Sequence, residues 1–132
     1  MLRLSALAET LVRAAFYLVG YVIAATAGTW LVTYVLSKLV LTEEQRNALA
    51  AIKGAGKIIG ILERILTVTF IYANAPTAIA LVFAAKSIIR FEAAKERPFA
   101  EYYLIGTMTS ITLAALTGIL FATLAQTFTL ST

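Results

Sequence analysis

Glu63, Arg64 and Lys86 are the residues of this sequence best placed to do chemistry, because each interrupts an apolar stretch. A charge at the centre of a bilayer costs at least about 2.5–3.5 kcal/mol, so such residues pair with one another or serve an ion path. If the chain folds back at Ala75, helical rise places Glu63 about 18 Å and Lys86 about 16 Å from the fold. We therefore predict an ion pair between them. Arg64 points about 100° away from Glu63 and needs another partner, or must extend to the interface.

A second charged group is expected closer to the membrane interface. Arg90 and Glu101 flank the charged loop at residues 92–98 and are predicted to pair. Three roles are open for the cluster of Glu63, Arg64, Lys86, Arg90 and Glu101: fixing helix register, binding an ion or substrate, or binding headgroup phosphates. The headgroup candidates are the basic residues towards the same face, Lys57, Lys86, Arg90 and Lys95.

The composition indicates a membrane as the setting for these charges. Of the 132 residues, 61% are hydrophobic and 14% charged, whereas soluble domains carry about 45–50% and about 25%. We predict one transmembrane domain over residues 1–132. The chain has no Cys, His or Asp, so disulfides, imidazole catalysis and most transition-metal sites lack their ligands. No metal or cofactor is expected. The net charge of +4 fits orientation and anionic lipids better than nucleic acid.

Two enzyme signatures are incomplete. Residues 54–57 read Gly-Ala-Gly-Lys, like the end of a P-loop, but Ala51 stands at the earlier glycine position and Ile58 follows the lysine. Ser87 is adjacent to Lys86, but neighbours on a helix diverge by about 100° and do not form a nucleophile–base pair. We therefore expect no enzymatic activity.

Apolar runs and breaks predict four helices. An amphipathic start at residues 2–13 leads into an apolar run at 14–35. Ala25-Thr26-Ala27 would suit signal-peptide cleavage, but the apolar run continues past it. Thr42 to Gln45 has the spacing of a capping box, so a second helix begins there and becomes apolar over 57–73. Asn74-Ala75-Pro76 ends it. A third helix follows at 76–90 and a fourth at 98–126. The second and third form a hairpin, either fully spanning or re-entrant.

Lys and Arg residues predict the orientation of this all-α transmembrane bundle. They concentrate on the side of loops 42–57 and 92–98, which should be cytoplasmic, at positions Lys38, Arg46, Lys53, Lys57, Arg90, Lys95 and Arg97. The opposite side has only Arg3 and Arg13. The termini and the tip at 74–76 should therefore lie outside a multi-pass protein of the cell membrane. Aromatic belts should follow, with Trp30, Tyr34, Tyr102 and Tyr103 on the cytoplasmic side and Phe16, Tyr17 and Tyr72 outside.

Small residues recur every four positions on three of the helices. Because lipid is as apolar as leucine, helices in a bilayer associate through close contact at such residues. The stripes are Gly20, Ala24 and Gly28 on the first helix, Gly56 and Gly60 on the second, and Gly106, Ser110, Ala114 and Gly118 on the fourth. They predict either packing within one protomer or self-association.

Three short motifs follow one another in residues 56–110: GILER at 60–64, AAKSIIRFE at 84–92 and AEYYLIGT at 100–107. Together they resemble a pattern of small prokaryotic integral membrane proteins of unknown function. The resemblance implies a membrane protein and supplies no reaction. Our leading hypothesis is a non-enzymatic, structural or partner-binding membrane component that forms homo-oligomers. The alternative is a small ion or solute transporter or channel lined by Glu63, Arg64 and Lys86.

Overall fold

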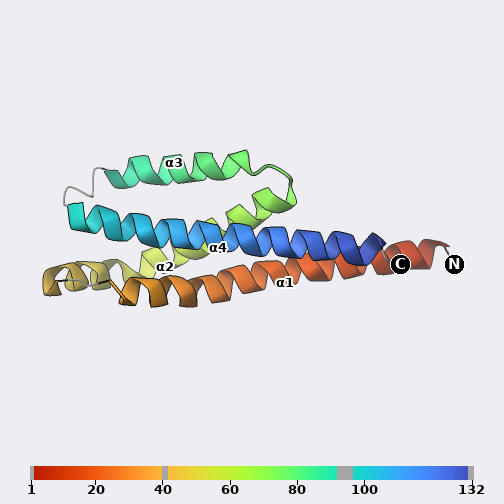
Figure 1. The fold of residues 1–132 in the computed structure, drawn as a ribbon, viewed down its shortest axis with the longest axis horizontal. Coiled ribbons are helices and arrows are strands. Elements are labelled where there is room, and N and C mark those ends of the chain that lie inside the picture. Colours follow the sequence, from red (N-terminus) through yellow and green to blue (C-terminus); the bar gives the residue numbers. More distant parts are fainter. Residues whose placement is uncertain (1, 40–41, 92–96, 131–132) are drawn as a thin grey trace.

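The structure, a computed structural model, describes residues 2–39, 42–91 and 97–130. These residues form four helices: α1 (Leu2–Ser37), α2 (Glu43–Tyr72), α3 (Thr77–Phe91) and α4 (Arg97–Leu130). No strand occurs within these three segments. The predicted all-α, four-helix bundle is therefore confirmed, and the helix bounds lie within a few residues of the predicted ones (Figure 1).

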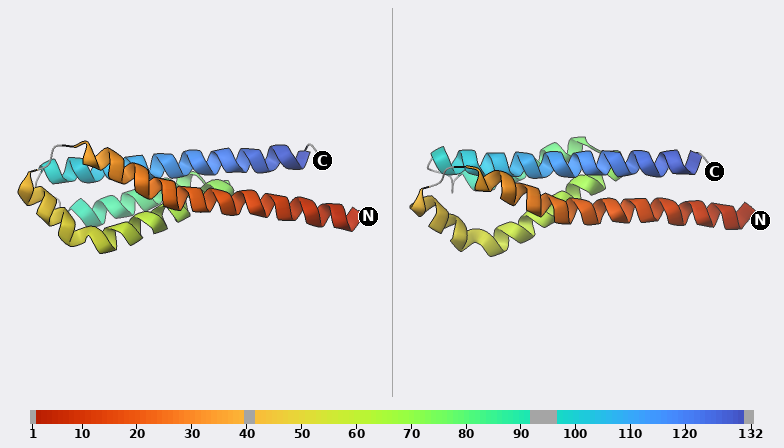
Figure 2. Two further views of the ribbon diagram at one scale, coloured as in Figure 1. Left: turned by 90° about the horizontal axis from the view of Figure 1, so that it is seen from below. Right: turned by 60° about the horizontal axis from the view of Figure 1, so that its bottom comes forward.

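The two longest helices, α1 and α4, lie side by side along most of their length (Figures 1 and 2). Their 36 and 34 residues correspond to about 54 Å and about 51 Å of helix. The amphipathic start of the chain is part of α1 and forms no separate element. Segments Ser5–Ser37 and Ala100–Thr129 are, by length and composition, apolar enough to cross a membrane.

The helix α2 begins at Glu43, directly after the predicted capping residue Thr42. Glu43 and Glu44 occupy its first turn, where negative charge is favourable next to the positive end of the helix dipole. The polar start and the apolar second half form one continuous helix, which bends in its N-terminal half (Figure 2). The second half packs against both α1 and α4 and positions Glu63 and Arg64.

A tight turn reverses the chain between α2 and α3. Asn74 has a positive φ of 55°. The amide of Ala75 donates to the carbonyl of Phe70 at 2.8 Å, and that of Asn74 donates to the carbonyl of Ile71 at 3.0 Å. These bonds form a Schellman-type cap around a residue in the left-handed region. Asn tolerates this region better than most residues, and Pro76 then sets the first turn of α3. The predicted break at 74–76 is thus a defined cap.

The cap gives a direct prediction for Asn74. We expect Asn74→Val to lower the free energy of unfolding by about 1–2 kcal/mol, since a β-branched side chain is strained at positive φ. Asn74→Gly should keep or slightly raise stability. Unfolding in detergent micelles measures both, with Ala80→Val on the exposed surface of α3 as the matched control. Equal stability of the valine and glycine variants would contradict the strained cap.

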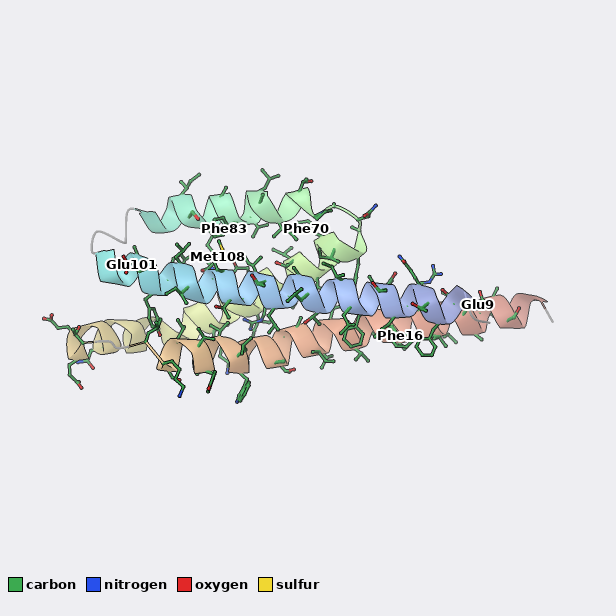
Figure 3. All side chains as sticks on the ribbon, viewed as in Figure 1. Glu9, Phe16, Phe70, Phe83, Glu101 and Met108 are labelled. Atoms are coloured by element: carbon green, nitrogen blue, oxygen red, sulfur yellow. The ribbon has the colours of Figure 1, made fainter. Side chains whose placement is uncertain are left out.

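The helix ends lie in two groups. Both termini lie at one end of the bundle, whereas the C-terminal ends of α1 and α3 and the N-terminal ends of α2 and α4 lie at the other (Figure 1). Glu9 and Glu101 mark these opposite ends in Figure 3. The helix α3 packs chiefly on α2. Phe83 of α3 and Met108 of α4 project into the space between their helices (Figure 3). The termini and the loop ends thus lie at opposite ends of the bundle, as the sequence predicts, whereas the turn between α2 and α3 lies part-way along it (Figure 1).

Polarity in this bundle is inverted relative to a water-soluble protein. The buried hydrophobic side chains of the described residues are small or medium in size: Ala24, Val68, Ala114 and Ala125. Buried polar and charged side chains are more numerous: Glu63, Arg64, Thr67, Thr107, Ser110 and Thr117. Large aliphatic side chains lie outside, with Leu81 and Ile88 of α3 each 73% exposed. The core is thus held by close backbone approach and polar contacts.

Candidate functional site

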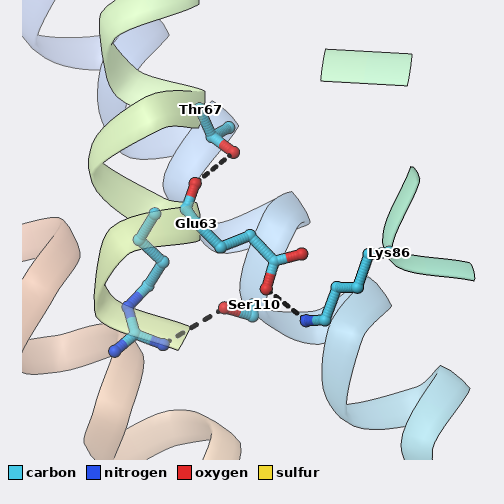
Figure 4. A network of polar contacts seen from close by, with 5 residues as sticks. Glu63, Thr67, Lys86 and Ser110 are labelled. Atoms are coloured by element: carbon cyan, nitrogen blue, oxygen red, sulfur yellow. Dashed lines mark hydrogen bonds and ion pairs between the residues drawn. The ribbon is translucent and has the colours of Figure 1, made fainter. Parts of the chain in front are cut away.

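The predicted ion pair between Glu63 and Lys86 is present and joins α2 to α3 (Figure 4). The Lys86 ammonium donates to Glu63 Oε2. Glu63 is only 4% exposed, whereas the Lys86 side chain is 20% exposed. The Lys86 nitrogen also lies 5.3 Å from the ring centroid of Tyr103 on α4, within the range of a cation–π contact. One lysine therefore contacts two helices besides its own.

Arg64 finds its partners on α1 and α4. Its Nη1 donates to Ser110 Oγ at 3.1 Å, and Figure 4 shows this bond beside the Glu63–Lys86 pair. Its Nη2 donates to Thr29 Oγ1 at 2.6 Å and to the carbonyl of Ala25 at 3.3 Å. Arg64 is 3% exposed, so it does not reach the interface. The planar guanidinium links three helices with fixed geometry.

The charges of the network do not cancel. Glu63 carries one negative charge, and Arg64 and Lys86 carry one positive charge each, so the three groups sum to +1. The partners of Arg64 on α1 and α4 are neutral oxygens. Two buried atoms, Glu63 Oε1 and Arg64 Nε, have no hydrogen-bond partner in the described part of the chain. Each retains the capacity to bind one more polar group.

The small-residue stripe of α1 receives the side chains of α2. A Cβ built on Gly28 would collide with Arg64 Cδ and lie 2.7 Å from its Nε. A Cβ on Gly20 would collide with the Tyr72 hydroxyl. Ala24, between them, is 1% exposed and packs in the core cluster. A larger residue at either position would force the arginine or tyrosine side chain to move, because both lie directly on the α1 backbone.

The stripe of α4 is also used inside the protomer. A Cβ on Gly106 would lie 3.4 Å from Leu36 of α1, and one on Gly118 would lie 3.2 Å from Ile71 of α2. Ser110 binds Arg64, and Ala114 is fully buried. Of the two alternatives for these stripes, packing within one protomer accounts for the contacts of α1 and α4.

The stripe of α2 behaves differently from the other two. A Cβ on Gly56 would meet no described atom within 4 Å, and one on Gly60 would meet only Arg64 of its own helix, at 3.5 Å. Expected packing of α1 or α4 on Gly56 and Gly60 is therefore not seen among the described residues. The bend in α2 explains this, because its N-terminal half diverges from α1 and α4 (Figure 2).

Aromatic residues close the bundle near the hairpin tip. The rings of Tyr17 and Tyr72 stack with centroids 4.4 Å apart, and Tyr21 meets Tyr72 edge-on at 5.3 Å. The Tyr21 and Thr69 hydroxyls are hydrogen-bonded at 2.8 Å. Tyr17 and Tyr72, predicted for an outer aromatic belt, are thus also contacts between α1 and α2.

The other predicted charged site residues are either exposed or outside the described part of the chain. The side chain of Arg90 and the whole of Lys95 lie outside the described residues, so the Arg90–Glu101 pair stays a prediction. Glu101 and Lys57 are exposed. The headgroup role of Lys57, Arg90 and Lys95 also stays a prediction. In the described part of the chain, no three His, Cys, Asp or Glu residues gather in a metal-binding arrangement.

Sequence reasoning missed the partners of Arg64. Thr29 was not singled out, and Ser110 was expected to act through its small size, whereas its hydroxyl accepts from the guanidinium. One signal was available. Ala25 and Thr29 are four residues apart, so they lie on one face of the helix, close to Gly28. The Ala25 carbonyl and the Thr29 hydroxyl therefore lie beside a site where another helix can approach closely.

The motifs at 60–64, 84–92 and 100–107 supply Glu63, Arg64, Lys86 and Tyr103, which the fold brings into one network. Their resemblance to small prokaryotic membrane proteins stays a prediction. No family model matches the chain, and no curated protein or solved structure is significantly similar to it.

Proposed function

We propose that this chain is a multi-pass membrane protein with a structural or partner-binding role. The observation that carries the proposal is the inverted polarity of the bundle, with charged and hydroxyl side chains inside and large aliphatic side chains outside. In water, that surface would expose apolar area that soluble proteins keep covered. In a bilayer, lipid covers it, and the charges face one another inside the bundle as the membrane requires.

The charge network supports a structural role through the number of helices it joins. Arg64 binds α1 and α4 from α2, and the Glu63–Lys86 pair binds α3 to α2. Without a hydrophobic drive between helices in lipid, such polar contacts and close packing hold a bundle together. Each helix is thus tied to α2 by a contact specific in direction and register.

The outer apolar faces support a partner or a second copy. The small-residue stripes of α1 and α4 contact their own protomer, so association would use the larger side chains that remain outside. The face of α3 with Leu81 and Ile88 is the most exposed of these, and α3 has the fewest neighbours in the bundle. Cross-linking of the purified protein in lipid nanodiscs would count the copies.

Cysteine accessibility tests the membrane placement and its orientation on a chain without native cysteine. We expect Glu9→Cys to react with a membrane-impermeant maleimide on intact bacterial cells, and Asn47→Cys to react only after permeabilisation. Both positions are exposed, and they lie on the two predicted sides. Wild-type protein is the unlabelled control. The reverse pattern would overturn the orientation, and extraction of the protein by alkaline carbonate would overturn membrane insertion.

The two unpartnered atoms favour one second candidate, a small ion or proton transporter. Buried polar groups without partners are costly and recur at functional sites, and Glu63 Oε1 and Arg64 Nε lie at the centre of the bundle's polar network. Proton or ion flux into proteoliposomes decides between the two. Flux that is present in wild type and abolished in a stably assembled Glu63→Gln variant would favour the transporter. Absence of wild-type flux, with a destabilised variant, would favour the structural role.

A further inference from the structure

An exposed ladder of Trp30, Tyr34 and Lys38 runs along the last turns of α1 and into the turn after Ser37. It belongs neither to the charge network nor to the packing stripes. The rings of Trp30 and Tyr34 stack with centroids 5.8 Å apart and planes 12° from parallel. The Lys38 ammonium lies 5.4 Å from the Tyr34 centroid. Trp30 is 70% exposed and Tyr34 50%. The four-residue spacing keeps all three on one outward face.

The ladder has a polarity that matches a phospholipid. From Trp30 to Lys38 the helix rises about 12 Å, so an indole, a phenol and an ammonium succeed one another from the apolar side towards the end of the bundle. Tryptophan and tyrosine favour the depth of the headgroups, and lysine extends to the phosphates. The Trp30 and Tyr34 rings present apolar area to acyl chains and glycerol. The Lys38 ammonium lies at the level of the headgroups.

The charge of Lys38 is available for an anion. In the described segments, Lys38 forms no ion pair with a carboxylate. In those segments the ammonium contacts the Tyr34 ring face and forms no hydrogen bond to an oxygen, so N–H donors remain for phosphate oxygens. The ring holds the ammonium over the ladder, which reduces the entropy lost when a phosphate binds.

We propose that Trp30, Tyr34 and Lys38 form a binding site for one anionic phospholipid of the leaflet at the loop end of the bundle. The proposal rests on the membrane placement proposed above. The lipid phosphate binds the Lys38 ammonium. The part of an acyl chain nearest the glycerol lies along the Tyr34 and Trp30 rings. Positive charge on the site and negative charge on the lipid select anionic over zwitterionic headgroups.

Trp30 reports directly on its own lipid neighbour, because it is the single tryptophan of the chain. Bromine on an acyl chain quenches a tryptophan in contact with it. The full-length protein is reconstituted in phosphatidylcholine bilayers with the same minor fraction of brominated phosphatidylglycerol or brominated phosphatidylcholine. We expect the quenching to report about fivefold enrichment of the anionic lipid at Trp30, which corresponds to about 1 kcal/mol for one lysine.

Two matched variants identify the residue responsible. Lys38→Gln should reduce the enrichment to about onefold, since the cation is gone while the rings remain. Arg13→Gln removes one exposed cation from the opposite end of α1 and should leave the enrichment unchanged. Both positions are exposed, so both variants are expected to fold.

The outcomes separate this proposal from the membrane placement. Equal quenching by both brominated lipids, or enrichment that survives Lys38→Gln, would overturn the lipid site and leave the membrane placement intact. Absence of quenching by either lipid would show that Trp30 does not face acyl chains and would overturn the site, whereas extraction by alkaline carbonate tests the membrane placement separately.

Discussion

Lys86→Met is expected to lower the free energy of unfolding by about 3 kcal/mol, because it leaves the Glu63 carboxylate buried without its counterion. Glu63 is 4% exposed, and its Oε1 already lacks a partner among the described residues. In the variant, both carboxylate oxygens would lie in a low-dielectric interior without the ammonium that pairs with Oε2. Denaturant titration of the protein in detergent micelles, followed by circular dichroism, measures the loss.

A double variant separates the pair from its individual members. Replacing both partners, in Glu63→Met/Lys86→Met, should recover most of the lost stability, since an apolar pair of similar volume is often as stable as a buried ion pair. Lys57→Met is the matched control, an exposed lysine on α2 whose removal should change stability by less than about 0.5 kcal/mol. If Lys86→Met is as stable as wild type, the ion pair contributes nothing to the bundle.

Gly28→Leu is expected to have the second large effect, a loss of more than about 3 kcal/mol. Even a Cβ at this position collides with Arg64. The side chain must leave its place, and the guanidinium then loses its bonds to Ser110 and Thr29. Hydrogen bonds to charged groups contribute about 1.5–3 kcal/mol each, and overpacking adds about 1–3 kcal/mol.

The control for this change is its neighbour on the helix. Ala27 is exposed, so Ala27→Leu adds the same bulk on the outer face and should be close to neutral. If Gly28→Leu prevents assembly altogether, Gly28→Ala should give a smaller, measurable loss in the free energy of unfolding. In an Arg64→Ala background the penalty of Gly28→Ala should largely vanish, because the colliding side chain is gone. Additive losses in that double variant would show that the two residues do not interact.

Much of the fold follows from local chemistry along the chain. The lengths of the apolar runs and the positions of Asn74 and Pro76 predict four helices and a hairpin, because helix breaks are encoded in a few residues. The Glu63–Lys86 pair is equally accessible to prediction. A hairpin turn at a known residue fixes which positions on its two arms lie at the same height, and helical rise supplies the distance.

The partners of Arg64 could not be obtained this way. They come from α1 and α4 and are 35 and 46 positions away from Arg64 in the sequence, whereas Glu63 and Lys86 are 23 positions apart on the two arms of one hairpin. Their height relative to α2 depends on how three helices slide and rotate when they pack. The bend of α2, which leaves Gly56 without a contact in the described part of the chain, has the same origin.

The small-residue stripes show the boundary between the two kinds of information. A four-residue repeat of Gly, Ala and Ser indicates that a helix face permits close approach, and this is a local property of the helix. Which helix makes that approach depends on long-range packing. The folded bundle places Arg64 and Tyr72 of α2 against Gly28 and Gly20 of α1. Large side chains of one helix fit there because glycine leaves the backbone of the other helix uncovered.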